Sequence, residues 1–214
     1  MTRGRFITLE GGEGAGKSTQ SELLAAWLSA QGVKTIQTRE PGGSPRAEAL
    51  RELLLSGVVE PFGPDAEALV FAVARADHMN ETIRPALRGG TWVICDRFID
   101  STRAYQGASG VDPQEINRLE NLAVGSDWPD LTLIFDLPAV VGVYRAQSRS
   151  GPVDRFEADD IAVQEIRRQR FLDIAKVEAE RCVVIDASKS PEEVSKAAQE
   201  AVKARLGSYL PDAG

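Results

Sequence analysis

The sequence predicts an α/β fold in which helices cover both faces of a parallel sheet. Short apolar runs alternate with longer segments of helical periodicity along the whole chain, and a glycine-rich loop separates the first run from the first long segment. Strands separated by helical segments form βαβ units, whose parallel sheet is buried on both faces. Because the 214 residues contain no evident linker or internal repeat, we expect one domain over residues 1–214.

The expected strands are short apolar runs, of the length that buried strands have. Residues 6–9 form the first, residues 92–95 lie in the third and residues 182–185 lie in the fifth. We expect strands near residues 5–10, 33–38, 91–96, 131–137 and 181–186.

The expected helices are longer segments with apolar residues on one face. The first carries Leu24 and Leu28 at helical spacing, and Pro113 and Pro191 stand near the starts of two others, where proline fits the first turn. Residues 207–214, with two glycines and a proline, are expected to fray. We expect helices near residues 17–31, 44–56, 64–88, 112–124, 159–180 and 190–206.

The glycine-rich loop is the most specific motif. Residues 11–18 read Gly-Gly-Glu-Gly-Ala-Gly-Lys-Ser and fit G-x-x-x-x-G-K-[ST] at every fixed position, between an expected strand and an expected helix. Glycines let backbone amides turn inward around an anion at a helix N-terminus. We therefore expect a phosphate-binding loop in which Lys17 reaches the β/γ-phosphates and Ser18 binds Mg²⁺. The alternative is a glycine-rich turn with a surface lysine, which would not require a strand before the loop and a helix after it.

A carboxylate ends the third expected strand. Asp96 follows residues 93–95 and would lie at the sheet edge beside the phosphate-binding loop, where open α/β folds bind ligands. There it could hold Mg²⁺ through water, and the adjacent Arg97 would face phosphate. The alternative is a carboxylate that caps the following turn.

Two further segments predict a second ligand next to the phosphates. Residues 39–43, Arg-Glu-Pro-Gly-Gly, follow the second strand as a sharp turn, with the Glu40–Pro41 bond a candidate for cis. Phe71 and Arg75 are four residues apart on one helical face and could form a nucleobase slot; the alternatives are a core phenylalanine and a solvated arginine. His78 is interpreted as a surface or supporting residue without a catalytic role.

Polar residues and arginines complete this set. Gln106 presents a donor and an acceptor that suit a pyrimidine edge. Residues 145–157 carry three arginines around Ser-Gly-Pro, which predicts a mobile basic flap that closes over phosphates.

Composition excludes several other classes. A net charge of −7 argues against binding long nucleic acid through a basic face. No stretch approaches the ~20 apolar residues of a membrane span, and one histidine with two distant cysteines gives no metal-ligand spacing. Cys95 and Cys182 lie in apolar runs, and we see no signal peptide, so a reducing cytoplasm is expected.

Five motifs together resemble the bacterial thymidylate kinase family along nearly the whole chain. They are Glu-Gly-Gly-Glu-Gly-Ala-Gly-Lys-Ser-Thr at 10–19, Arg-Glu-Pro-Gly-Gly at 39–43, Phe-x-x-x-Arg at 71–75, Asp-Arg-Phe-Ile-Asp-Ser at 96–101 and Ala-Tyr-Gln-Gly at 104–107. The resemblance implies a three-layer α/β/α P-loop kinase with strand order 2-3-1-4-5 and a lid near residues 145–157. It also implies the reaction ATP + dTMP → ADP + dTDP in dTTP biosynthesis, with Mg²⁺ as cofactor.

The resemblance also implies roles for single residues. Glu13 would bind the 3′-hydroxyl of dTMP, Arg51 and Arg97 its phosphate, and Phe71 would stack on thymine. The residues implied to bind dTMP are Glu13, Arg39, Arg51, Phe71, Arg75, Arg97, Ser101, Thr102, Tyr105 and Gln106. Those implied to bind ATP are Gly11, Gly12, Glu13, Gly14, Ala15, Gly16, Lys17, Ser18, Thr19 and Arg145, and the metal is assigned to Ser18 and Asp96.

The catalytic assignment follows from the chemistry of phosphoryl transfer. The dTMP phosphate oxygen is already an anion, so no general base is needed, and catalysis depends on positioning and charge neutralisation. Some family members carry an arginine after the acidic residue of the loop, but this chain has Gly14 there. The resemblance therefore implies a lid arginine, Arg149 or Arg155, acting with Lys17 and Arg97.

The partners and alternatives remain open at this point. The resemblance suggests a homodimer through helices near 44–56, 64–88 and 112–124. A kinase for another pyrimidine nucleoside monophosphate, such as dUMP or dCMP, is the nearest alternative. A nucleotide-dependent switch would not need a second arginine-rich site and would be expected to carry N-K-x-D if it bound guanine. An inactive binding module would be expected to lack Lys17 or Asp96, and both are present.

Overall fold

A computed structural model of the chain describes residues 3–148, 155–156 and 159–211. Its centre is a five-stranded parallel sheet in the order β2-β3-β1-β4-β5, which confirms the predicted topology. The strands are β1 Phe6–Glu10, β2 Thr35–Arg39, β3 Trp92–Asp96, β4 Leu131–Asp136 and β5 Cys182–Asp186.

Helices connect these strands, and the predicted boundaries agree with the observed ones to within three residues wherever a helix was expected as a single element. The α-helices are α1 Lys17–Ala30, α2 Pro45–Leu55, α3 Pro64–His78, α4 Arg84–Arg88, α5 Ile99–Ala108, α6 Pro113–Val124, α7 Ala139–Gln147, α8 Ile161–Val177 and α9 Pro191–Leu206. Short 3₁₀ turns lie at Glu60–Phe62 and Gly207–Tyr209.

Two predictions, one about a helix and one about the chain end, need correction. The helix expected over 64–88 is divided into α3, a π-helical turn at Met79–Ile83, and α4. Pro85 cannot donate a backbone hydrogen bond to residue 81, and the wider π turn accommodates its ring. Residues 207–211 do not fray, because the Tyr209 ring stacks against the Arg5 guanidinium at 3.3 Å.

Two helices, α5 and α7, were not predicted at all. In α5 the polar side chains of Asp100, Thr102 and Gln106 are buried, so the segment lacks an apolar stripe at helical spacing. In α7 the β-branched residues of the first turn hide the helical pattern.

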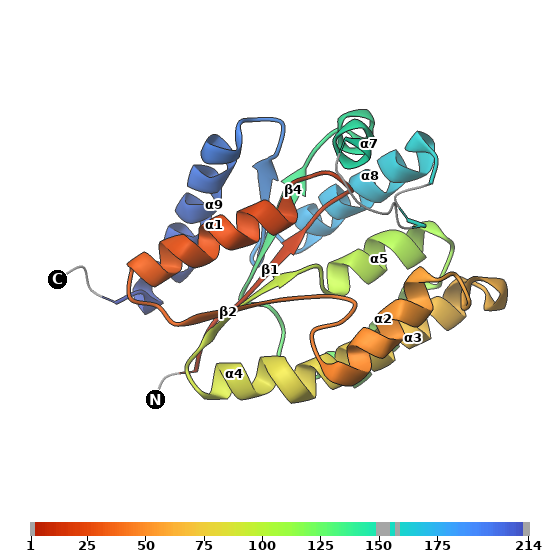
Figure 1. Cartoon of the computed structure of the whole chain (residues 1–214), viewed down its shortest axis with the longest axis horizontal. Helices are drawn as coiled ribbons and strands as arrows, with labels where there is room; N and C mark the ends of the chain where they lie inside the picture. Colours follow the sequence, from red (N-terminus) through yellow and green to blue (C-terminus); the bar gives the residue numbers. More distant parts are fainter. Residues whose placement is uncertain (1–2, 149–154, 157–158, 212–214) are drawn as a thin grey trace.

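The two faces of the sheet support separate halves of the core. Ile7, Leu9 and Ile94 pack on α1 and α9 on one face. Phe6 and Val93 point to the other face, where α3, α4 and α6 cover them. Figure 1 shows this layering, with α1 and α9 on one side of the strands and α4 on the other. The predicted three-layer α/β/α architecture is confirmed. No helix among the described residues is long and apolar enough to cross a membrane.

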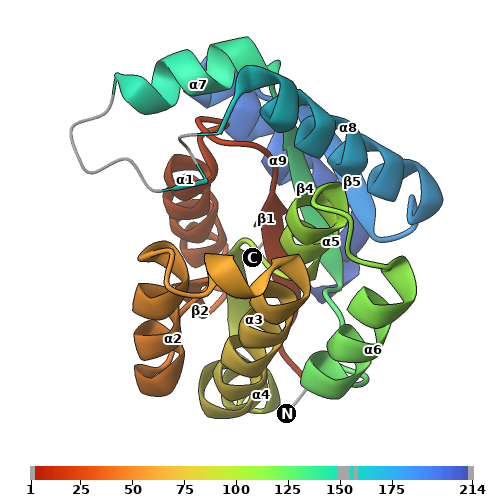
Figure 2. The ribbon, with the colours of Figure 1, turned by 90° about the vertical axis from the view of Figure 1, so that its right-hand side faces the viewer.

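The loop between β1 and α1 packs tightly against α7. A side chain at Gly14 would place its Cβ 2.1 Å from the Gly142 carbonyl oxygen, and Gly14 has φ +66°. A side chain at Gly142 would in turn meet the Glu13 carbonyl at 2.3 Å. Position 14 therefore has no room for an arginine side chain. Figure 2 shows the loop between α7 and α8 on one side and α2 and α3 on the other.

Candidate active site

A cavity of about 400 Å³ opens at the carboxyl ends of β1, β2 and β3, the edge where open α/β sheets bind ligands. It brings together the predicted residues Glu13, Gly14, Ala15, Gly16, Lys17, Ser18, Thr19, Arg39, Arg51, Phe71, Arg75, Asp96, Arg97, Ser101, Thr102, Tyr105, Gln106 and Arg145. Residues that line it without having been predicted are Glu40, Pro41, Leu55, Phe98 and Phe156.

The phosphate-binding loop forms one end of the cavity. The Lys17 ammonium donates to the carbonyl oxygens of Gly11 at 3.1 Å and Gly12 at 2.8 Å. These two predicted residues do not line the cavity themselves. Burial and the nearby Arg97 charge lower the pKa of Lys17. Since α1 begins at Lys17, its free amides and a cation converge on the place where phosphates would sit.

A hydroxyl and a carboxylate lie together beside this loop. The Ser18 hydroxyl donates to Asp96 Oδ2 at 2.8 Å, at the end of β3. Oxygen ligands of this kind fit Mg²⁺, which usually takes one or two protein ligands together with water and phosphate oxygens. Among the described residues, no group of three or more carboxylate, histidine or cysteine side chains could hold a metal ion.

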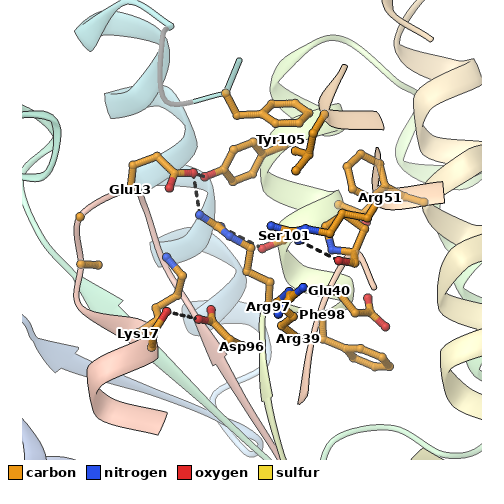
Figure 3. Close-up of a pocket in the computed structure, with 18 of the residues that line it drawn as sticks. Glu13, Lys17, Arg39, Glu40, Arg51, Asp96, Arg97, Phe98, Ser101 and Tyr105 are labelled. Atoms are coloured by element: carbon orange, nitrogen blue, oxygen red, sulfur yellow. Dashed lines mark hydrogen bonds and ion pairs between the residues drawn. The ribbon is translucent and has the colours of Figure 1, made fainter. Parts of the chain in front are cut away.

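Three side chains point toward one another in the middle of the cavity (Figure 3). Glu13 Oε1 accepts from Arg97 Nη2 and from the Tyr105 hydroxyl, each at 2.6 Å. Burial alone would raise the pKa of Glu13, but the charges of Arg97 and Lys17 and the Tyr105 hydrogen bond outweigh it and hold the pKa at about 2. Glu13 is therefore an anion in this site, and it fixes the position of Arg97.

Arg97 has an unusual backbone conformation for a non-glycine residue, with φ 67°. This left-handed geometry turns its side chain back over the phosphate-binding loop, where Nη1 donates to the Gly11 carbonyl at 3.1 Å and to Ser101 Oγ at 3.2 Å. Strained backbone is found where surrounding contacts hold it in place. Arg97 thus reaches the phosphate-binding loop through a turn that the sequence did not reveal.

Glu10 supplies those surrounding contacts, and it was not predicted. Its fully buried carboxylate accepts from the Phe98 backbone N–H at 2.7 Å and from Ser101 Oγ at 2.6 Å. Burial, followed by the charge of Asp100, raises the pKa of Glu10 to about 7. Glu10 ends β1 after Phe6-Ile7-Thr8-Leu9, all of them buried, so the strand pattern alone could not mark it as a functional residue.

The other end of the cavity carries the predicted base slot. Phe71 and Arg75 both line it from α3, and Arg75 is only 2% exposed, so the alternative of a solvated arginine is wrong. Arg75 donates through Nε to Glu40 Oε2 at 2.7 Å and through Nη2 to Thr102 Oγ1 at 3.0 Å. Gln106, buried on α5, lines the same end.

The turn after β2 lies beside this slot. The Glu40–Pro41 bond is cis, as the sequence suggested. Arg51 donates through Nη1 to the Pro41 carbonyl at 2.8 Å, whereas Arg39 pairs with the exposed Glu48 carboxylate at 3.1 Å. Both arginines line the cavity, but Arg51 is the one held by the turn.

The arginines of the predicted flap occupy different places. Arg145 belongs to the last turn of α7, so the flap begins as helix, and its Nη1 donates to the Ala187 carbonyl at 3.0 Å. Arg155 does not line the cavity; it pairs with Glu67 on α3 and with Glu60 at 3.4 Å. Arg149 lies outside the described residues.

An aromatic group and a buried arginine that were not predicted lie at the base slot. The Phe156 ring lies 6.3 Å from Phe71 and 5.8 Å from Tyr105, measured between centroids. The Arg167 guanidinium stacks 4.4 Å from the Tyr105 ring and donates to the Phe156 carbonyl at 3.3 Å. The aromatic residue beside Arg155 was a possible signal for Phe156, but nothing in the spacing of α8 marked Arg167.

Comparison with known proteins gives one consistent family. A model of the thymidylate kinase family matches residues 9–198. The thymidylate kinase of Bradyrhizobium sp. (strain ORS 278) is 53% identical over 207 residues, which cover 95% of this chain and 92% of that protein. The thymidylate kinase of Afipia carboxidovorans is 52% identical over 212 residues, covering 98% and 93%. The crystal structure of thymidylate kinase from Ehrlichia chaffeensis is 36% identical and matches with a TM-score of 0.75, covering 94% of this chain and 99% of that one.

Proposed function

The chain belongs to the thymidylate kinase family, and on that premise we propose that its cavity holds ATP and dTMP together and transfers the γ-phosphoryl group, giving ADP and dTDP. As a member of this family it is an ATP-dependent nucleoside monophosphate kinase. The observation that supports this function best is a single cavity with a phosphate-binding loop at one end and an aromatic, arginine-lined slot at the other. A nucleotide-dependent switch would need only the first end.

The acceptor would lie across the middle and far end of this cavity. Arg97 and Arg51 would bind its phosphate, and Glu13 would accept from the sugar 3′-hydroxyl. Phe71 would stack on thymine, while Arg75 and Gln106 would read its polar edge. This assignment is supported by the way Glu13 and Tyr105 hold Arg97 between the phosphate-binding loop and the base slot.

The residues around the loop would do the chemical work by position and charge. The acceptor oxygen needs no general base, because a phosphate monoester is already ionised at neutral pH. Lys17 and Arg97 would neutralise the charge that develops on the transferred group. Ser18 and Asp96 would hold Mg²⁺, which when bound neutralises the negative charge of the β- and γ-phosphates.

The donor nucleotide would lie between the phosphate-binding loop and α7. Arg145 would pack against adenine, and Arg149 or Arg155 would approach the γ-phosphoryl group when the lid closes. Arg155 would have to leave Glu67 and Glu60 to do so.

A homodimer through α2, α3 and α6 is also part of the proposal. Large apolar side chains are exposed on all three helices: Leu69 and Val73, one helical turn apart on α3, are each 52% exposed, Leu122 on α6 is 83% exposed, and Leu53 on α2 is 37% exposed. Light scattering of the purified chain tests this, since a mass twice that of the chain supports the dimer. The cytoplasmic location rests on the two buried free thiols, Cys95 and Cys182.

A coupled assay of ADP formation tests the substrate. Purified protein with ATP and Mg²⁺ should turn over dTMP faster than dUMP, dCMP, dAMP and dGMP at equal concentrations. Preferred turnover of dUMP or dCMP would favour the alternative of a kinase for another pyrimidine nucleotide.

A further inference from the structure

The only histidine in the described structure lies within a buried row of polar side chains that ends at the arginine of the base slot. His78 is fully buried in the last turn of α3. Its Nδ1 lies 3.0 Å from Glu40 Oε1, and its Nε2 lies 2.7 Å from Thr38 Oγ1. Glu40 Oε2 in turn accepts from Arg75 Nε at 2.7 Å. The row thus runs from the end of β2 through Thr38, His78 and Glu40 to the arginine of the base slot.

The turn after β2 is shaped around this row. A Cβ at Gly43 would lie 2.3 Å from His78 Nε2 and 2.4 Å from Thr38 Oγ1, and Gly43 has φ +84°. Only glycine fits both conditions. Gly43 therefore leaves space for His78, and this contact links the turn at residues 39–43 to the end of α3.

The guanidinium of Arg75 is held at two of its three nitrogens. Nε donates to Glu40, and Nη2 donates to Thr102 Oγ1 at 3.0 Å and to the Phe98 carbonyl at 3.2 Å. Among the described residues no hydrogen bond involves Nη1. Because a guanidinium is planar, these contacts fix the direction of Nη1 as well.

We propose that His78 and Glu40 are positioning residues for recognition of the acceptor base: they orient Arg75 so that Nη1 offers its hydrogens to the carbonyl edge of the pyrimidine. This inference rests on the proposed function. Glu40 alone could rotate about its last bond, since Arg75 occupies only one of its oxygens. His78 holds the other oxygen and takes its own orientation from Thr38, so the carboxylate keeps one position.

A positioning role for His78 and Glu40 has measurable consequences that a purely space-filling role would not have. The Arg75 guanidinium can only donate hydrogen bonds. A fixed Arg75 therefore favours a pyrimidine with a carbonyl oxygen over one with an amino group at the same position. Loosening the row should therefore weaken dTMP binding and reduce the preference for dTMP over dCMP, while the ATP end stays intact. If His78 only filled space, its replacement would lower stability but would change neither the dTMP KM relative to the ATP KM nor the preference for dTMP over dCMP.

The test compares His78→Phe, which removes both hydrogen bonds, with His78→Asn, whose amide can still donate to Glu40. We expect His78→Phe to raise the KM for dTMP about tenfold, the size of one lost charge-assisted hydrogen bond, and to change the KM for ATP little. His78→Asn should remain within about threefold of the wild type for dTMP. Thr38→Val, at the far end of the row, should raise the dTMP KM in the same direction by a smaller factor.

Two controls separate positioning from loss of fold. Ile83→Val makes a small cavity in the neighbouring core without touching the row, and thermal unfolding of every variant shows whether it folds. If His78→Phe does not fold, Thr38→Val and His78→Asn carry the comparison. The proposal is overturned if dTMP and ATP KM values change equally, or if the dTMP to dCMP preference is unaltered. Failure of the wild type to phosphorylate dTMP would instead overturn the proposed function.

Discussion

Replacing Glu10 by glutamine should make the protein relatively more stable at alkaline pH. The carboxylate of Glu10 is fully buried between β1 and the turn that carries Arg97, and burial together with Asp100 raises its pKa to about 7 from the ordinary value of 4.5. The folded protein therefore binds a proton at Glu10 more tightly than the unfolded chain does. Its contribution to stability is complete below pH 4.5 and is lost as the pH rises through 7.

The size of this effect follows from the two pKa values. A rise from 4.5 to about 7 corresponds to roughly 3.4 kcal/mol once titration is complete, and about 2.5 kcal/mol of it falls between pH 5 and pH 8. In Glu10→Gln the amide oxygen can still accept from the Phe98 N–H, and its amino group can donate to Ser101 Oγ. The variant should therefore lose the pH dependence and keep the turn.

Denaturant unfolding of both proteins at several values between pH 5 and pH 8 measures this difference. The free energy of unfolding of the wild type, minus that of Glu10→Gln, should fall by about 2.5 kcal/mol across the range. Glu22→Gln, at an exposed position on α1, reports the effect of removing a carboxylate from the surface. A wild-type minus Glu10→Gln difference that stays constant within about 0.5 kcal/mol would show that Glu10 is not the buried acid described here.

The remaining predictions concern turnover. Lys17→Ala should nearly abolish turnover and leave thermal unfolding almost unchanged, because the ammonium bonds only loop carbonyls; wild-type turnover would refute its phosphate role. Arg75→Ala should raise the KM for dTMP roughly ten- to a hundred-fold and that for ATP far less, and it should also lower stability because Glu40 Oε2 is left buried without its arginine, with only His78 beside the other oxygen; equal changes in both KM values would indicate a structural role alone. Arg149→Ala should lower kcat at least about tenfold with little change in the dTMP KM, and Arg155→Ala should do so only if Arg155 leaves α3 on lid closure. Single-turnover measurements on both variants and their double mutant decide this, since an unimpaired chemical step would exclude a lid arginine.

Functional residues that lie close together in the sequence at characteristic spacings were predictable. The phosphate-binding loop needs glycines, lysine and serine at fixed intervals, and Phe71 and Arg75 share a helical face, so neither required knowledge of the fold. The strand order came from the resemblance to a family, because periodicity identifies strands but does not place them side by side. The helix α5 was missed because buried polar residues, among them Asp100, Thr102 and Gln106, interrupt the apolar stripe that Ile99, Ala104 and Tyr105 would otherwise form.

Residues that work through distant contacts were not predictable. Glu10 and Ser101 meet across ninety residues of chain, and neither carries a local signal for the other. His78 was expected at the surface or in a supporting place, and only the fold shows that the glycine turn at Gly43 brings Thr38 beside it. The ion pair between Arg155 and Glu67 was not predictable for the same reason, because the two residues lie far apart in the sequence and meet only in the folded chain.

Direct detection of the product in a mixture tests the central claim most plainly. The protein, ATP and Mg²⁺ are incubated with equal amounts of dTMP, dUMP and dCMP, and the nucleoside diphosphates are separated by chromatography, with Lys17→Ala as the inactive control. The account predicts that dTDP accumulates first and that ADP appears in equal amount. Formation of ADP without dTDP, or earlier accumulation of dUDP or dCDP, would contradict it.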